Sequence, residues 1–179
     1  MKNIKTRNMV ITALLTGLTI VIPMLPLRVW IPPAFTATLA LHVPIFVAMF
    51  ISPLSAAFVS LGSALGFAFT GLPPVIAARA ATHVVFAVMG AYMIRKMAPF
   101  NVGKIVIIGL ATAVIHAVFE MVAVIPFVIL SPEEGNVAYE AFFVVGVGTL
   151  IHHAIDYVIT IGVLTALGKA KLIDWRFSQ

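Results

Sequence analysis

The chain has 179 residues, of which 62% are hydrophobic and only 9% are charged, and its mean hydropathy is +1.15. A soluble domain carries about 25% charged residues, so the composition predicts an integral membrane protein with one domain over residues 1–179. The formal net charge is +5, and the charged residues lie mostly in short loops between apolar runs. This distribution is typical of membrane proteins and argues against nucleic-acid binding. The chain has no cysteine, which excludes disulfides, thiolate metal ligands and a thiol nucleophile.

Apolar runs predict an all-α protein with six transmembrane helices. A helix needs about 20 residues to cross the hydrocarbon core. Proline and glycine turns separate the runs, which predicts helices over residues 8–25, 37–51, 54–70, 75–94, 106–129 and 137–167. No small-residue cleavage site follows the basic start, so we expect the first run to be a retained helix and not a signal peptide.

The basic residues between the runs predict the orientation. Cytoplasmic loops carry an excess of Lys and Arg, and six spans place both termini on the same side. The opposite side carries Arg28, Glu133 and Glu134. The basic residues on the side of the termini, which we therefore expect to be cytoplasmic, are Lys2, Lys5, Arg7, Arg95, Lys96, Lys104, Lys169, Lys171 and Arg176.

The fourth run carries two polar side chains one helical turn apart, Arg79 and His83. An arginine within a span costs about 2.5 to 3.5 kcal/mol on insertion scales, so partners must offset that cost. Counting about 1.5 Å per residue places both side chains in the outer half of the bilayer, with His42 of the second run and Glu120 of the fifth. The residues expected to roof this outer cluster are Trp30, Phe35, Asn136 and Tyr139.

Two interpretations of the outer cluster stay open. In the first, it is a small-molecule pocket open to the outside, where the Arg79 guanidinium binds a carboxylate with two parallel donors. His83, His42 and Glu120 then add hydrogen bonds. In the second, Arg79 and Glu120 form a buried structural ion pair. Both hold if Glu120 neutralises Arg79 until the ligand arrives. We favour the pocket, because buried ionisable residues in membranes are functional by default.

A second polar set is expected past the midplane, and it contains His116, His152, His153 and Asp156. Imidazole and carboxylate groups suit first-row transition metals. With Glu120, this inner set keeps open a metal-ion transporter or a metal-dependent intramembrane enzyme. We favour instead a hydrogen-bonded polar cluster between the fifth and sixth helices, and we assign no metal.

Sequence motifs for catalysis are missing from the chain. It has no G-x-x-x-x-G-K-[ST] phosphate loop, no H-E-x-x-H and no G-x-S-x-G. We therefore predict no catalytic residue and no cofactor. Uphill transport by this chain would need an energy source elsewhere.

Small residues predict two close helix contacts. Ala13 and Gly17 in the first run form a small-xxx-small pair, and Gly62 and Gly66 form another in the third run. Such pairs let helix backbones approach closely in membranes. The first pair can serve packing within the chain or an interface with another membrane protein.

The chain resembles the substrate-binding S components of energy-coupling factor (ECF) vitamin transporters. The resemblance covers nearly the whole chain and rests on the six predicted helices, the basic N-terminus, the Ala13–Gly17 pair, residues 35–53 (FTATLALHVPIFVAMFISP) and residues 71–80 (GLPPVIAARA). It is strongest for the branch that takes up small acidic vitamins. Gly17 departs from the Ala-xxx-Ala motif of this family, but glycine is smaller and keeps the close approach.

The resemblance implies that substrate capture and energy supply are carried out by different subunits. An S component captures a vitamin from outside the bacterial cell membrane, while a membrane coupling protein and two cytoplasmic ATPases supply the energy. On this analogy, Ala13 and Gly17 face the coupling protein and the loop over residues 27–36 gates the pocket. The implied chain is a transport subunit and not an enzyme.

The vitamin is expected to carry a carboxylate, because Arg79 is the cation of the predicted pocket. Pantothenate offers a carboxylate, an amide and two hydroxyls to Arg79, the histidines and Glu120, and it is the first expectation. Nicotinate offers a carboxylate and an aromatic ring, which suit Arg79 with Trp30 or Phe35, and it is the second.

Overall fold

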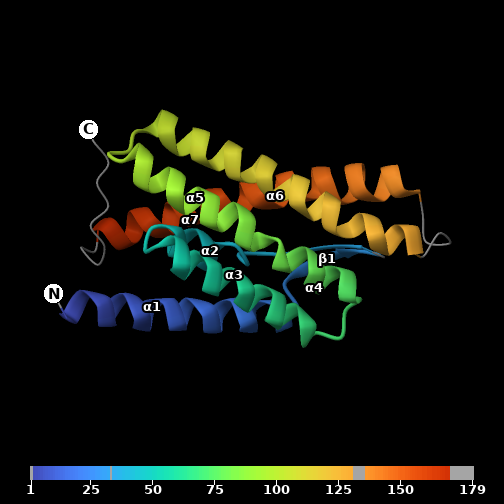
Figure 1. The fold of residues 1–179 in the computed structure, drawn as a ribbon, viewed down its shortest axis with the longest axis horizontal. Helices are drawn as coiled ribbons and strands as arrows, with labels where there is room; N and C mark the ends of the chain where they lie inside the picture. The colour runs from blue at the N-terminus through green and yellow to red at the C-terminus, as the bar shows by residue number, and fades with distance from the viewer. Residues whose placement is uncertain (1, 33, 131–135, 170–179) are drawn as a thin grey trace.

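The structure is a computed structural model that describes residues 2–32, 34–130 and 136–169. Long helices lie side by side around a short β-hairpin (Figure 1). Glu133, Glu134, Lys171 and Arg176, which entered the orientation argument, lie outside the described residues. The elements are α1 (Lys2–Val21), η1 (Ile22–Met24), β1 (Arg28–Ile31), β2 (Phe35–Thr38), α2 (Val43–Met49), α3 (Pro53–Ala68), α4 (Pro74–Ala81), α5 (His83–Met97), α6 (Val102–Leu130), the π-helix η3 (Tyr139–Val147) and α7 (Gly148–Lys169).

Within the described ranges, four helical stretches have the length and composition to cross a membrane: Lys5–Met24, Pro74–Met97, Val102–Leu130 and Tyr139–Lys169. The apolar helix α3 is shorter. These stretches and α3 occupy the positions of the predicted runs other than the second. The prediction of one continuous helix over residues 37–51 is wrong.

The second run is divided between a strand, a turn and a short helix. Phe35–Thr38 forms β2, and α2 has only seven residues, Val43–Met49, with Pro44 in its first turn. The segment predicted as a loop over residues 27–36 contains β1, which pairs antiparallel with β2 from Arg28↔Thr38 to Ile31↔Phe35. This pairing satisfies backbone groups that a helix would otherwise satisfy, a strict requirement at membrane depth.

Two further predicted runs are irregular beside polar residues. The run over 75–94 is interrupted at Thr82, whose Oγ1 donates a hydrogen bond to the carbonyl oxygen of Arg79 at 2.7 Å and ends α4. The run over 137–167 begins with the π-helix η3 before α7 starts at Gly148. Such π segments are frequent at functional sites. Both irregularities turn side chains away from the directions that a straight helix would give.

The α1–α3 contact depends on glycines. A Cβ atom added to Gly66 would lie 2.6 Å from the carbonyl oxygen of Ile20, and one added to Gly62 would lie 2.5 Å from Oγ1 of Thr19. Thr19 Oγ1 also donates a hydrogen bond across the contact to the carbonyl oxygen of Val59 at 2.8 Å. Gly62 and Gly66 therefore allow the close approach that the small-residue spacing indicates.

Gly66→Ala is expected to destabilise the protein by about 1–3 kcal/mol, because the new methyl group overpacks the backbone of α1. Gly17→Ala is the matched control, since an added Cβ there meets nothing within 4 Å. Melting temperatures of the two variants in detergent check this prediction. A melting temperature that falls equally in both variants would contradict it.

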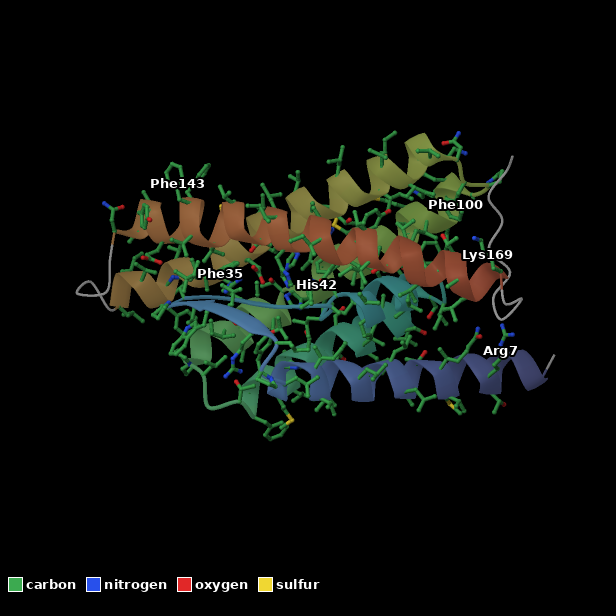
Figure 2. The ribbon with its side chains drawn as sticks, turned by 180° about the vertical axis from the view of Figure 1, so that it is seen from behind. Arg7, Phe35, His42, Phe100, Phe143 and Lys169 are labelled. Atoms are coloured by element: carbon green, nitrogen blue, oxygen red, sulfur yellow. The ribbon has the colours of Figure 1, made fainter. Side chains whose placement is uncertain are left out.

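The two termini of the described chain lie at one end of the molecule (Figure 1). Arg7 at the start of α1, Phe100 between α5 and α6, and Lys169 at the end of α7 share that end, and Phe143 lies at the other (Figure 2). The basic residues on these element ends are Lys5, Arg7, Arg95, Lys96, Lys104 and Lys169. This clustering is the pattern that the positive-inside rule requires.

Two apolar clusters flank the middle of the molecule. One contains Phe46, Phe86 and Phe100, of which Phe100 lies at the basic end (Figure 2), and the other contains Phe35 and Val124. Buried polar residues from α2 to α7 lie between them, with His42 near the centre (Figure 2). The polar centre is thus buried between the two apolar clusters.

Candidate functional site

Arg79 is the buried cation of the polar centre, with 3% of its surface exposed. Its Nη2 donates to Oε2 of Glu120 at 2.6 Å, and its Nη1 donates to the carbonyl oxygen of Ala34 at 2.6 Å. The guanidinium carbon lies 4.9 Å from the centre of the Phe35 ring, a cation–π distance. The Nε–H group is buried and has no hydrogen-bond partner among the described residues. Arg79 therefore keeps one donor for a ligand.

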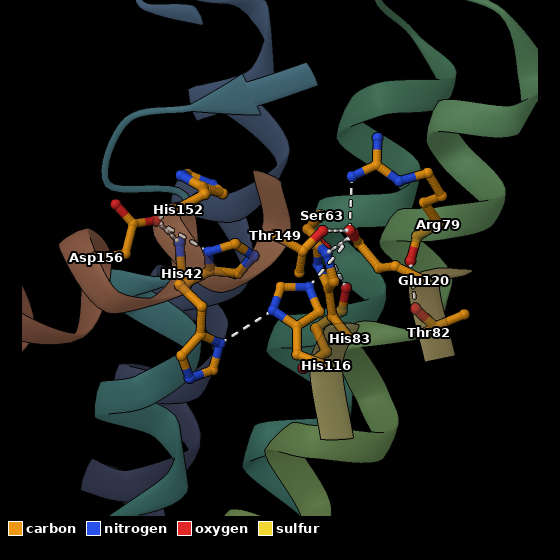
Figure 3. A network of polar contacts seen from close by, with 12 residues as sticks. His42, Ser63, Arg79, Thr82, His83, His116, Glu120, Thr149, His152 and Asp156 are labelled. Atoms are coloured by element: carbon orange, nitrogen blue, oxygen red, sulfur yellow. Dashed lines mark hydrogen bonds and ion pairs between the residues drawn. The ribbon is translucent and has the colours of Figure 1, made fainter. Parts of the chain in front are cut away.

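Glu120 connects three helices to Arg79 (Figure 3). Its Oε2 accepts from Arg79 and from the hydroxyl of Thr149. Its Oε1 lies 3.2 Å from Nε2 of His83 and 3.3 Å from Nε2 of His116. A buried carboxylate needs such partners to stay charged, so Glu120 neutralises Arg79 in this conformation.

All five histidines of the chain meet around His42. The ring centre of His42 lies 4.8 Å from those of His83 and His116, 4.7 Å from that of His152 and 6.2 Å from that of His153. The expected division into an outer and an inner set is therefore wrong. His42 does lie beside His83, and with Arg79 and Glu120 both line one cavity, as the expected outer cluster requires. The depth count instead separated His116, His152 and His153 from that cluster.

Asp156 fixes the turn that carries His42. Its Oδ1 accepts from the backbone N–H of Ala40 at 2.8 Å, and its Oδ2 accepts from both the backbone N–H and the Nδ1 of His42 at 3.0 Å. Ala40 has a φ of 64°, in the left-handed region that a non-glycine residue adopts only when its surroundings enforce it. The carboxylate of Asp156 supplies that enforcement from α7.

The predicted roof residues divide into two groups. Phe35 is buried on the guanidinium of Arg79. Trp30 is 48% exposed on β1, and Tyr139 is 58% exposed with its ring 6.1 Å from that of Phe143. Asn136 is exposed, and its Oδ1 accepts from the backbone N–H groups of Ala138 and Tyr139. Asn136 thus begins a helical segment, and neither it nor Tyr139 covers the cluster.

Hydroxyl groups in the site were not predicted. Ser63 Oγ lies 2.9 Å from Nδ1 of His83, Thr112 Oγ1 lies 3.1 Å from Nε2 of His153, and Thr149 donates to Glu120. Serine and threonine are common in membrane helices, where they also bond to their own backbone. The presence of serine and threonine therefore did not indicate a site. Ser63 directly follows Gly62, a member of the glycine pair at the α1–α3 contact.

Two cavities meet at this cluster. The polar one, lined by Thr36, His42, Arg79, His83, Glu120 and His152 among others, measures about 10 Å³ and has room for about one water. The other is an apolar groove of about 500 Å³ between the hairpin and α7, lined by Val29, Phe35, Gly148 and Ile151 among others. His152 lines both cavities, so it marks the boundary between them.

This geometry favours anion binding over catalysis. A buried guanidinium with a spare donor, an adjacent aromatic ring and an exchangeable counter-charge is suited to a small carboxylate. The fold and the site together define a multi-pass membrane protein with an internal polar cluster.

Comparison with known proteins identifies the family. The chain is 38% identical over 178 residues to the niacin transporter NiaX of Lactococcus lactis subsp. cremoris (strain MG1363), covering 97% of this chain and 80% of NiaX. No family model and no solved structure matches the chain. The chain therefore belongs to the NiaX family of vitamin-uptake proteins of the cell membrane, in agreement with the resemblance to S components. The relative is named for niacin, whereas pantothenate was the first expectation for this chain.

Proposed function

We propose that this protein is the S component of an ECF importer and captures nicotinate at Arg79. The observation that carries the proposal is the buried guanidinium with an unpartnered Nε–H and the Phe35 ring 4.9 Å away. A carboxylate can accept from Nε and a terminal nitrogen in parallel, while a pyridine ring packs against Phe35. The similarity to a niacin transporter supports the same ligand.

The shape of the site supports nicotinate over pantothenate. Next to Arg79, the lining residues are mostly imidazoles and apolar side chains, and the polar cavity is small. A flat ring with one carboxylate leaves few polar groups to satisfy. Pantothenate brings an amide and two hydroxyls, which cost free energy when they are buried without partners.

Entry of the vitamin requires Phe35 to move. Phe35 lines the groove and contacts Arg79, and its ring would lie 2.6 Å from a Cβ added to Gly148. Displacing the ring would join the groove of about 500 Å³ to the polar cavity. Glu120 then exchanges its contact with Arg79 for one with the histidines, and the carboxylate of the vitamin takes its place. The hairpin is thus the lid.

A panel of ligands tests the proposed vitamin. Nicotinate is expected to raise the melting temperature of the purified protein, because a ligand that binds only the folded state stabilises it. Nicotinamide is the matched control, since it has the same ring without the charge, and it is expected to give a much smaller shift. A larger shift with pantothenate than with nicotinate would contradict this assignment.

The exposed face of α1 is proposed to contact the coupling protein. Ala13 and Gly17 are exposed there, beside the exposed side chains of Val10 and Leu14. An added Cβ at Gly17 meets nothing within the described chain. Small residues flanked by apolar ones provide a flat surface for another helix. The basic end of the molecule is proposed to face the cytoplasmic ATPases.

Gly17→Trp is expected to abolish co-purification with the coupling protein and to leave nicotinate binding unchanged, because the bulky ring blocks close approach on α1. Leu110→Trp is the control, since Leu110 is also exposed but lies on α6. Co-purification from membranes that contain the complete transporter measures the effect. Unchanged co-purification of Gly17→Trp would place the interface elsewhere.

A further inference from the structure

We propose that the imidazoles of His42, His83 and His116, together with the carboxylate of Glu120, form a binding site for one divalent transition-metal ion such as Zn²⁺ or Co²⁺. The three histidines each offer a ring nitrogen, and these nitrogens all lie within 4.8 Å of one another. The three side chains are at most 2% exposed. Each comes from a different helix or helix start, so the fold itself brings them together (Figure 3).

One ring nitrogen of each histidine, Nδ1, already contacts a neighbouring side chain, which we call its outer partner. Histidine ligands in protein metal sites are held in the same way. This leaves Nε2 of each ring for an ion. The outer contacts are Nδ1 of His42 to Oδ2 of Asp156 at 3.0 Å, Nδ1 of His83 to Oγ of Ser63 at 2.9 Å, and Nδ1 of His116 to Nδ1 of His153 at 3.0 Å.

Two of the three Nε2 atoms are unsatisfied. Nε2 of His42 and Nε2 of His116 are buried and make no hydrogen bond within the described residues. A buried polar atom without a partner costs about 1–3 kcal/mol; Nε2 of His116 has only its 3.3 Å contact with Oε1 of Glu120 to offset that cost, and Nε2 of His42 has no hydrogen bond among the described residues. A shared ion would satisfy both at once.

Glu120 supplies the fourth ligand. Its Oε1 lies 3.2 Å from Nε2 of His83 and 3.3 Å from Nε2 of His116. Two ligands of a tetrahedral ion with bonds of 2.0–2.1 Å are separated by about 3.3 Å, so these spacings already fit. Oε2 remains bound to Arg79 and Thr149, which holds the carboxylate in place.

The donor set decides the class of ion. Three imidazoles and one carboxylate suit Zn²⁺, Co²⁺ and Ni²⁺, whereas Mg²⁺ and Ca²⁺ prefer oxygen ligands. The other candidate group, His42, His152 and Asp156, is less suited. Both oxygens of Asp156 already accept hydrogen bonds from the turn at Ala40 and His42.

Cobalt binding to tag-free, chelator-treated protein tests the proposal. We expect one Co²⁺ per chain with the intense visible absorption of tetrahedral coordination, and its displacement by Zn²⁺. His116→Gln is expected to weaken binding at least 100-fold. His152→Gln is the matched control, because it alters the other candidate group alone, and it is expected to change the affinity less than about threefold.

If His116→Gln does not fold, Ser63→Ala tests the metal site instead, because Ser63 contacts Nδ1 of the proposed ligand His83. Loss of an outer partner weakens metal affinity about 10–100-fold. The proposal is overturned if the wild-type protein takes up no stoichiometric ion, or if His152→Gln abolishes binding while His116→Gln retains it. Arg79→Ala separates this site from the vitamin site, since it is expected to abolish nicotinate binding, whereas the ion still binds with an affinity weakened by no more than the about 10–100-fold of a lost outer partner.

Discussion

Arg79→Ala is expected to lower the affinity for nicotinate by about 30-fold to several thousand-fold. Removing one partner of a buried, hydrogen-bonded charge pair costs about 2–5 kcal/mol, and each 1.4 kcal/mol is a factor of ten. Arg79→Lys is expected to recover only part of the affinity, since lysine keeps the charge and loses the planar fork. Isothermal titration of the purified variants measures both effects.

Two control variants separate binding from folding. Arg95→Ala removes an exposed arginine at the basic end and is expected to bind nicotinate like the wild type. The double variant Arg79→Ala/Glu120→Gln removes both charges of the buried pair, so it is expected to fold without an uncompensated charge. If this folded double variant bound nicotinate with wild-type affinity, Arg79 would not be the carboxylate ligand.

Glu120→Gln is expected to have opposite effects without and with the vitamin. Without ligand, the variant leaves the Arg79 guanidinium buried without its counter-charge, which costs about 3–5 kcal/mol and lowers the melting temperature. With nicotinate, the carboxylate of the ligand replaces the missing charge. The increase in melting temperature on adding nicotinate should therefore be larger in Glu120→Gln than in the wild type.

Glu140→Gln provides the matched control for this charge removal. Glu140 is also buried, but its Oε2 has no hydrogen-bond partner in the described part of the chain, and no ion pair joins it to Arg79 there. Its replacement is expected to leave the nicotinate-induced shift unchanged. Equal shifts in the wild type and in Glu120→Gln would contradict the exchange of counter-charges at Arg79.

The sequence alone was sufficient to predict that Arg79 and Glu120 lie close together. Both residues lie on apolar helices, where helical spacing and depth are read directly from residue numbers, and an isolated charge there demands a partner. The structure has this contact at 2.6 Å. The same reasoning placed His83 at the depth of Glu120, and Nε2 of His83 lies 3.2 Å from Oε1 of Glu120.

The contacts of His42 with His116, His152 and His153 could not be predicted in this way. Residues 35–42 are apolar and resemble a helix in composition, yet they form β2 and a turn with Ala40 at positive φ. The determinants are long-range, namely the pairing with β1 and the Asp156 contacts from α7. Local sequence patterns carry no information about such contacts, so the histidines were divided into two sets that the fold joins.

The prediction that Asn136 and Tyr139 cover the cluster was wrong for a related reason. The run over 137–167 was treated as a regular helix, whereas Tyr139–Val147 is a π-helix with a different number of residues per turn. Side chains placed by α-helical counting therefore point elsewhere. Trp30 was judged by residue type alone, and β1 leaves it half-exposed.

A crystal structure of the protein with nicotinate bound shows whether Arg79 holds the vitamin. We expect the carboxylate of the vitamin within hydrogen-bond distance of Nε and a terminal nitrogen of Arg79, the pyridine ring against Phe35, and Glu120 displaced from Arg79 towards His83 and His116. A vitamin bound in the apolar groove, with the 2.6 Å contact between Arg79 and Glu120 intact, would contradict it.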